Sequence, residues 1–250
     1  MSAQALPDDP AAAQLVIGVL GGMGPAATAH FQTRLVELTD ATRDRDHPTV
    51  VTWSDPGVPD RVAALRGTGP SPVPVLRAGL GVLPAAGAQV LTVPCNTVHP
   101  FLPEALEGLD QLHLVDMIQA AAEEVAGAGM STVTVLATAA TLEHGMHARA
   151  LGERAVRAHS PGAGTQPAVL ELIAAVKAGT PVRGLVGEYR RLVAELAEAQ
   201  CDGVLVACSE ISAVAAAAAG EGAQLSLPSV DAVDSLVRVA LRAAGFIPKA

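Results

Sequence analysis

Three cysteines are the residues of this chain best suited to acid–base chemistry. Cys95 and Cys208 each end an apolar run, in Val-Pro-Cys-Asn-Thr (93–97) and Val-Ala-Cys-Ser-Glu (206–210), whereas Cys201 lacks such a setting. A thiolate can take a proton and a thiol can return one, and helix N-termini or cations nearby favour the thiolate. A cysteine at one strand end is more often a buried small apolar residue. The repeated setting favours two functional thiols, Cys95 and Cys208, and a structural Cys201.

A glycine-rich segment, Gly-Gly-Met-Gly-Pro at residues 21–25, follows the first apolar run. Glycine lets the backbone approach a ligand closely, and Pro25 suits the first position of a helix. The segment also matches a dinucleotide-binding pattern, which requires an acidic residue about 20 positions further on. The nearest candidate, Asp55, comes too late in the chain. The sequence therefore predicts a tight turn, either beside a substrate or with no ligand at all.

Composition narrows the class of protein. The 250-residue chain is 50% hydrophobic, 16% charged and only 2% aromatic, so a sizeable core must be built from Ala, Val, Leu and Ile. The formal net charge of −9 disfavours nucleic acid as a partner, because phosphates require basic surface. It does not disfavour a small anionic substrate held by a few local cations.

The N-terminal residues and the cysteine count bear on location. Residues 1–13 carry neither a basic stretch nor an apolar one and are expected to form a flexible segment. The longest bland run, 213–219, is too short and too weakly apolar to cross a bilayer. Three cysteines without metal-ligand spacing fit neither a metal site nor a paired disulfide framework. We therefore expect a cytoplasmic, reduced protein without membrane contact.

The elements that must position these residues alternate between strand and helix. Runs that are apolar throughout are typical of parallel strands buried on both faces, and strand–helix alternation predicts right-handed βαβ units in doubly wound sheets. The segments 55–74 and 160–167 are rich in proline and glycine and predict loops. Strands are expected at 15–20, 49–53, 89–93, 112–115, 132–136, 155–158, 203–207 and 225–227, and helices at 26–38, 117–126, 168–177, 185–199 and 230–243.

The matching cysteine settings predict two pseudo-symmetric α/β domains, each a doubly wound parallel sheet, with the active site in the cleft between them. The first domain is expected to comprise 14–112 plus 222–250, and the second 113–221. In parallel α/β folds, ligands bind beyond the carboxyl ends of the strands, where helix N-termini converge. Cys95, Cys208 and the glycine-rich segment all occur at such ends.

Taken together, these motifs resemble the aspartate/glutamate racemase superfamily, and in particular its aspartate racemase branch. That branch carries Gly-Gly-Met-Gly-Pro near the N-terminus, Pro-Cys-Asn-Thr-(Ala)-His midway and Gly-Cys-Thr-Glu near the C-terminus. The resemblance covers about residues 15–245 and implies a two-domain enzyme, often dimeric, that needs neither pyridoxal phosphate nor metal. It also implies that Cys95 and Cys208 are the catalytic thiols.

The resemblance assigns further residues to the substrate. Val-Pro-Asp-Arg (58–61) and Ala-Val-Lys-Ala-Gly (175–179) match segments whose cations bind the side-chain carboxylate, and a guanidinium fork suits bidentate carboxylate binding. Without the resemblance, both cations would be interpreted as ordinary charged side chains at the surface. The implied contacts to the substrate's α-carboxylate and amino group are Met23, Gly24, Asn96, Thr97 and Ser209, those to its side-chain carboxylate are Arg61 and Lys177, and Thr138 opens a matching Thr-x-x-Thr segment.

The chain departs from the family pattern at three positions. Ala207 replaces a glycine, Ser209 replaces a threonine, and His147 stands where a tyrosine is common. His99 and Glu210 follow the two cysteines and are expected either to relay protons or to cap and pack their helices. The departures leave the catalytic cysteines in place and bear on the choice of substrate.

Racemisation removes the α-proton from one face and returns a proton to the other, so two acid/base groups across a cleft are the economical solution. The sequence therefore predicts a cofactor-independent amino-acid racemase, with aspartate the favoured substrate, in which Cys95 and Cys208 exchange the roles of base and acid. The loop 55–74 is the expected lid, and a homodimer is the expected assembly. The alternatives are a broad-substrate or glutamate racemase, a non-racemising isomerase or decarboxylase of the superfamily, a dicarboxylate-binding protein, and, more distantly, a nicotinamide-dependent oxidoreductase.

Overall fold

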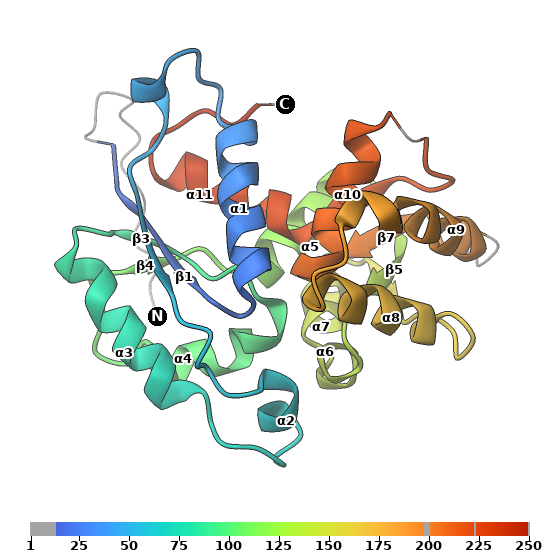
Figure 1. Ribbon diagram of the computed structural model, residues 1–250, viewed down its shortest axis with the longest axis horizontal. Coiled ribbons are helices and arrows are strands. Elements are labelled where there is room, and N and C mark those ends of the chain that lie inside the picture. The colour runs from blue at the N-terminus through green and yellow to red at the C-terminus, as the bar shows by residue number, and fades with distance from the viewer. Residues whose placement is uncertain (1–13, 198–200, 223, 250) are drawn as a thin grey trace.

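A computed structural model describes residues 14–197, 201–222 and 224–249; the segment 1–13, predicted to be flexible, lies outside the described residues. The described chain forms two parallel sheets of four strands each, side by side (Figure 1). The first has the order β2 (Val50–Ser54), β1 (Ile17–Gly21), β3 (Val90–Thr92), β4 (His113–Leu114), and the second β6 (Arg157–His159), β5 (Thr132–Leu136), β7 (Gly203–Val206), β8 (Ser229–Asp231).

The two sheets repeat one strand order, in which the first strand of each half lies between its second and third. This repetition confirms the predicted two-domain α/β architecture with pseudo-symmetric halves. β3 and β7 occupy the same place in their sheets, so the segments that follow them leave the sheets at corresponding points.

Helices connect the strands and cover the sheets. Those of the first half are α1 (Pro25–Leu38), α2 (Arg61–Leu65), α3 (Val73–Ala85) and α4 (Leu102–Ala105), with the 3₁₀ turns η1 (Asp44–Asp46) and η2 (Asn96–Phe101). The remainder are α5 (Met117–Gly127), α6 (Ala139–His144), α7 (Met146–Gly152), α8 (Gln166–Lys177), α9 (Val186–Ala197), α10 (Ser209–Gly220) and α11 (Ala232–Ala243), with η3 (Val182–Leu185). Among the described helices, none is both long and apolar enough to span a membrane.

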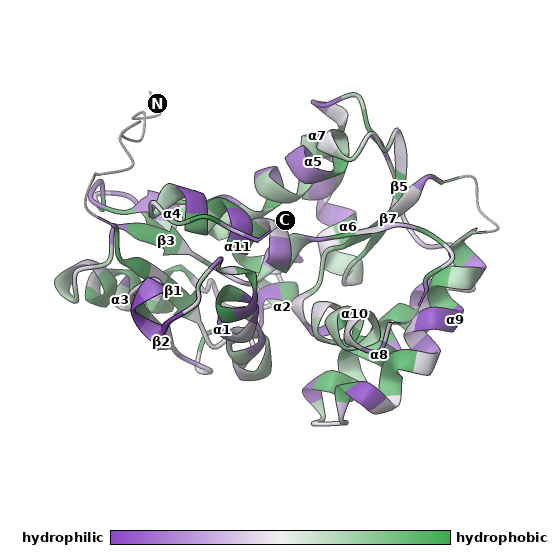
Figure 2. Cartoon of the chain, turned by 90° about the horizontal axis from the view of Figure 1, so that it is seen from above, coloured by the Kyte–Doolittle hydropathy of each residue, from purple (hydrophilic) through white to green (hydrophobic). Residues whose placement is uncertain are grey.

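The inner strands form because their side chains are mostly apolar and are covered on both faces of the sheets. All residues of β1, β3, β5 and β7 are buried, as expected for parallel strands with helices above and below. Figure 2 shows hydrophobic residues along β3, whereas α9 carries hydrophilic residues on its outer side. The largest core cluster runs from β1 and α1 through α11 and α5 to β5 and α7. The two halves are therefore joined by a continuous apolar core.

Two features differ from the sequence-based predictions. The strand expected at 225–227 lies at β8 instead, because Pro228 accepts a hydrogen bond from Val204 through its carbonyl group and pairing with β7 begins only at the next residue. Leu225 and Leu227 pack against the second core from a loop. The expected loop 55–74 contains α2 and the first residues of α3, because the Asp60 carboxylate accepts the N–H groups of residues 62 and 63 and caps α2.

The predicted domain boundaries need correction at two strands. β4 was expected in the second domain, yet it pairs with β3 in the first sheet. β8 was expected in the first domain, yet it pairs with β7 in the second sheet. α11 packs mainly on α1 and α5 and so belongs to the shared core. Pattern alone could not assign these short edge strands, since their partners are decided by tertiary packing.

Candidate active site

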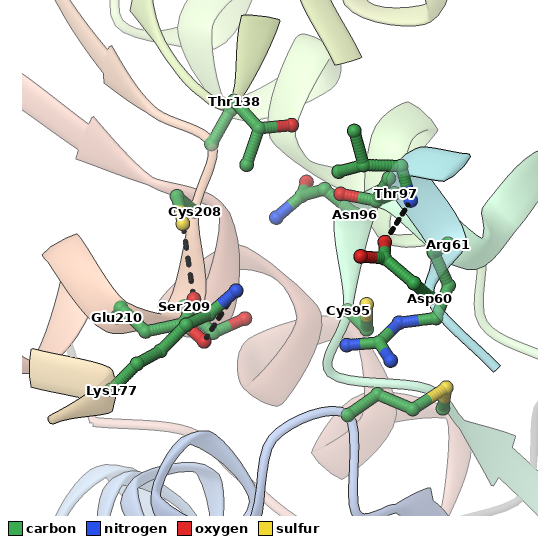
Figure 3. Close-up of a pocket in the computed structure, with 13 residues that line it drawn as sticks. Asp60, Arg61, Cys95, Asn96, Thr97, Thr138, Lys177, Cys208, Ser209 and Glu210 are labelled. Atoms are coloured by element: carbon green, nitrogen blue, oxygen red, sulfur yellow. Dashed lines mark hydrogen bonds and ion pairs between the residues drawn. The ribbon is translucent and has the colours of Figure 1, made fainter. Parts of the chain in front are cut away.

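Cys95 and Cys208 lie at corresponding ends of the two sheets. Cys95 precedes η2, just beyond β3, and Cys208 precedes α10, just beyond β7. Both line one pocket, and they lie on its opposite sides (Figure 3). Their exposed fractions are only 7% and 6%. The thiols are thus nearly enclosed by protein but border the same cavity.

The two thiols have different electrostatic surroundings. Burial raises the pKa of the Cys95 thiol, while the positive charge of Arg61 acts in the opposite direction. Burial raises the pKa of the Cys208 thiol well above its ordinary value, and the negative charge of Glu210 raises it further. The Cys208 Sγ–H donates to Glu210 Oε2 at 3.1 Å. Of the two groups, Cys95 is therefore better placed to become a thiolate, and Cys208 to hold its proton.

Glu210 connects Cys208 to a lysine at the mouth of the pocket. Its other oxygen, Oε1, lies 3.9 Å from Lys177 Nζ, and the lysine side chain is 51% exposed. Glu210 sits in the first turn of α10, where the helix dipole favours a carboxylate. Its side chain is thus in direct contact with a candidate catalytic thiol, beyond the helix-capping role that the sequence allowed.

The glycine-rich loop is held by one threonine of α1. Thr28 Oγ1 accepts the Gly22 N–H at 2.8 Å and donates to the Gly24 carbonyl oxygen at 3.1 Å. Met23 lines the pocket between these two anchored glycines. Gly24 faces Glu210, since a Cβ added to it would lie 4.0 Å from Glu210 Oε1. The loop therefore forms one wall of the site.

Gly22 is required by both conformation and space. Its φ is +92°, and an added Cβ would lie 2.3 Å from the Asp55 backbone. Gly22→Ala is expected to destabilise the fold by at least about 2 kcal/mol, since strain of this kind costs about 1–3 kcal/mol before any clash. Gly87→Ala is the matched control, because Gly87 has a φ of +90° and open space around its Cβ position. Thermal unfolding of both variants separates the clash from the strain; equal losses would contradict the packing role.

Asn96 and two threonines, Thr97 and Thr138, provide polar groups in the pocket lining. Asn96 Nδ2 is buried and has no hydrogen-bond partner among the described residues, although Asn96 lines the pocket. The hydroxyls of Thr97 and Thr138 both meet that of Thr141, at 3.0 and 2.9 Å. Because a buried donor without a partner is costly, Asn96 Nδ2 is a natural binding group for a ligand acceptor.

Two polar residues next to the cysteines are occupied by main-chain groups. Ser209 Oγ donates to the Pro94 carbonyl oxygen at 2.8 Å and so links the start of α10 to the segment before Cys95. His99 Nδ1–H donates to the Cys95 carbonyl oxygen, and its Nε2 accepts the Met117 N–H. With both ring nitrogens engaged and its pKa lowered by burial, His99 orders the turn after Cys95. These contacts agree with the packing role that the sequence analysis allowed for His99.

Arg61 reaches the pocket from the first position of α2. Its Nη1 donates to the carbonyl oxygens of Val58 and Pro59, at 3.3 Å each, which bends the guanidinium back toward Cys95 (Figure 3). Lys177 lies on the opposite side, near Cys208. Arg61 and Lys177 therefore border the same cavity, Arg61 from the first half of the chain and Lys177 from the second.

The pocket contains every predicted site residue except Gly24, which adjoins it. Four further residues line the pocket. The sequence analysis considered Glu210 only as a proton relay or a helix cap, and Asp60 could have been found as the cap of α2, whereas the small apolar side chains of Val62 and Ala207 give no indication of a site. The four are Asp60, Val62, Ala207 and Glu210.

The family model for Asp/Glu/hydantoin racemases matches residues 20–240, nearly the whole described chain. The chain belongs to this family. The resemblance predicted from its motifs is thereby confirmed, as is its assignment to the isomerases.

Individual relatives agree with the family assignment. RacX of Bacillus subtilis (strain 168), a broad specificity amino-acid racemase, is 25% identical over 207 residues, which are 80% of this chain and 87% of RacX. The aspartate racemase of Picrophilus torridus is 26% identical, with a TM-score of 0.78 over 94% of this chain and 96% of that one. The glutamate racemase of Francisella tularensis, in complex with D-glutamate, shares the fold at 12% identity and a TM-score of 0.61, over 90% and 79% of the two chains.

Proposed function

We propose that this racemase-family protein is a cofactor-independent amino-acid racemase that prefers aspartate and uses Cys95 and Cys208 as its two acid/base groups. The observation that carries the proposal is that these cysteines occupy corresponding strand ends and line one pocket from opposite sides. An α-proton lost on one face of a bound amino acid can then be replaced on the other face without rotation of the substrate.

In the reaction, a thiolate takes the α-proton and becomes a thiol, and the electron pair of the Cα–H bond remains on the substrate as a carbanion. The thiol on the other face then gives its proton to that carbon and becomes a thiolate. The negative charge spreads into the α-carboxylate, where donors such as Asn96 Nδ2 can stabilise it. Proton exchange between the thiols and solvent restores the starting enzyme.

The unequal surroundings of the thiols support an order for these roles. Arg61 favours ionisation of Cys95, while Glu210 holds the proton of Cys208. The resting enzyme therefore has Cys95 as the base and Cys208 as the acid. For the opposite enantiomer Cys208 must be the thiolate and Cys95 the thiol. Glu210, which already accepts the hydrogen bond of the Cys208 thiol, can take that proton, while the Cys95 thiolate takes a proton from solvent.

Two cations support a substrate with a side-chain carboxylate. Arg61 offers a fork for bidentate binding and Lys177 adds a point charge from the opposite wall. Both belong to segments that resemble those of the aspartate racemase branch, and the Picrophilus torridus relative is an aspartate racemase.

A broad-specificity amino-acid racemase is the second candidate. Its support is the pairing of Lys177 with Glu210, which leaves less free positive charge for a second carboxylate. Two acidic and two basic side chains line the pocket, a balance that also suits amino acids without a charged side chain. RacX is a broad specificity amino-acid racemase, and its similarity to this chain adds support to the second candidate. The homodimer and the cytoplasmic location stay predictions.

The experiment that tests the function is an NMR screen of L- and D-amino acids incubated with the protein in D₂O. Aspartate of either handedness should lose its α-proton signal and form the other enantiomer, faster than glutamate, alanine or serine. Similar rates for all of them would favour the second candidate. Binding of aspartate without α-proton exchange would contradict both.

The pH dependence of kcat/KM tests the effect of Glu210 on the thiols. Because burial and Glu210 raise the pKa of both thiols, kcat/KM should rise with pH as a thiolate forms above the ordinary thiol range. Glu210→Gln removes a negative charge, so the midpoint of this rise should move to lower pH. Glu171→Gln, at an exposed position of α8, is the control and should leave the profile in place. An unchanged midpoint in Glu210→Gln would contradict the assigned contact.

A further inference from the structure

His147 lies behind the pocket wall rather than in the pocket itself. It belongs to α7 in the second half, is 3% exposed, and its Nε2 lies 3.0 Å from Asn96 Oδ1 in the first half. An amide oxygen only accepts hydrogen bonds, so Nε2 must carry a proton and donate it. The contact therefore requires one particular tautomer of His147.

The orientation of the Asn96 amide depends on this contact. The two ends of an amide have nearly the same shape, so their hydrogen-bond partners decide which end faces which way. With Oδ1 held by His147, Nδ2 is directed into the pocket (Figure 3). In the other tautomer Nε2 would be an acceptor, the amide would turn over, and the pocket would present an oxygen.

The surroundings of His147 favour a neutral ring. Burial lowers the pKa of His147 to about 3, and the nearby His99 acts in the same direction. Its Nδ1 is buried without a hydrogen-bond partner among the described residues. If Nδ1 carried the proton, a buried N–H group would have no acceptor. With the proton on Nε2, that N–H group donates to Asn96 and only a lone pair on Nδ1 remains unpaired. His147 is thus a neutral ring that donates to Asn96 near neutral pH.

We propose that His147 is a positioning residue that keeps the Asn96 amide turned with its N–H₂ group toward the substrate, so that the site accepts a carboxylate and stabilises negative charge on it. The inference rests on the proposed function for its catalytic consequence. His147 does not line this pocket, and its hydrogen bond to Asn96 joins it to a residue that does. This gives a role to the histidine that departs from the family pattern.

A double-variant comparison tests the role. Removal of one preorganised donor lowers turnover by about 10²–10³-fold, so Asn96→Ala and His147→Phe should each lower kcat by about that factor. If His147 acts through Asn96, the double variant should be no worse than Asn96→Ala alone. His147→Gln, whose amide N–H reaches close to the position of Nε2, should recover most of the activity. Multiplying losses in the double variant would overturn the proposal.

A second measurement does not need activity or a folded variant. Nitrogen NMR of the wild-type protein with ¹⁵N-labelled histidine reports which ring nitrogen is protonated. We expect His147 to show the neutral Nε2–H form at and around neutral pH. An Nδ1–H form or a charged ring would overturn the inference even if the protein is a racemase. An Nε2–H form in a protein that exchanges no amino-acid α-proton would instead count against the proposed function alone.

Discussion

Cys95→Ser and Cys208→Ser should each abolish racemisation of aspartate, with a loss of about 10³-fold or more. A serine hydroxyl is a far weaker acid than a thiol, so it cannot supply a base near neutral pH, and acid–base groups contribute about 10²–10⁴-fold to enzymatic rates. Each variant keeps one thiol on one face of the substrate. In D₂O, Cys208→Ser should exchange the α-proton of one enantiomer only, and Cys95→Ser that of the other, both without inversion.

Cys201→Ser is the matched control for these variants. Cys201 lies away from the pocket lining, and its Sγ donates to the Leu196 carbonyl oxygen at 3.5 Å. This variant should racemise aspartate at the wild-type rate. Full racemisation by either active-site variant would end the two-base mechanism. Exchange of the same enantiomer by both variants would contradict the placement of the thiols on opposite faces.

Arg61→Ala should distinguish aspartate from alanine. Hydrogen bonds to charged groups contribute about 1.5–3 kcal/mol each, so loss of a bidentate contact should lower kcat/KM for aspartate by about a hundredfold or more. Alanine has no side-chain carboxylate and loses only the effect of Arg61 on Cys95. Because Arg61 lowers the pKa of that thiol, the variant should need higher pH for the same fraction of thiolate, and higher pH should restore alanine turnover.

Arg61→Lys separates the two roles of the guanidinium. It keeps a positive charge near Cys95 but lacks the planar fork, so alanine turnover should recover more fully than aspartate turnover. Arg45→Ala, at an exposed position of η1, is the control and should change neither. Steady-state kinetics on both substrates across pH measures these effects. Equal losses for aspartate and alanine at every pH would exclude Arg61 from side-chain recognition and favour a broad-specificity enzyme.

The parallel α/β fold and the segments that form the site could be predicted from the sequence by itself. Inner strands such as β1 and β7 have no polar side chain, as expected where both faces of a strand are buried, and this pattern is visible in the sequence alone. Cys95 and Cys208 follow such strands in different sheets, and ligands of parallel α/β folds bind beyond the carboxyl ends of the strands. The matching settings of the two cysteines in the two halves therefore predicted a shared site between them.

Only the tertiary structure decided which strands join which sheet at the edges and which polar atoms meet. The short strand β8 has little apolar pattern of its own and is defined by pairing with β7. The contacts of His147 with Asn96 and of Ser209 with Pro94 join residues 51 and 115 positions apart. A hydrogen bond forms only when the distance between donor and acceptor is correct to within a few tenths of an ångström, and the packing of the whole chain sets that distance. The type of a residue determines whether its side chain can donate or accept a hydrogen bond. The packing of the two halves decides which partner that side chain meets.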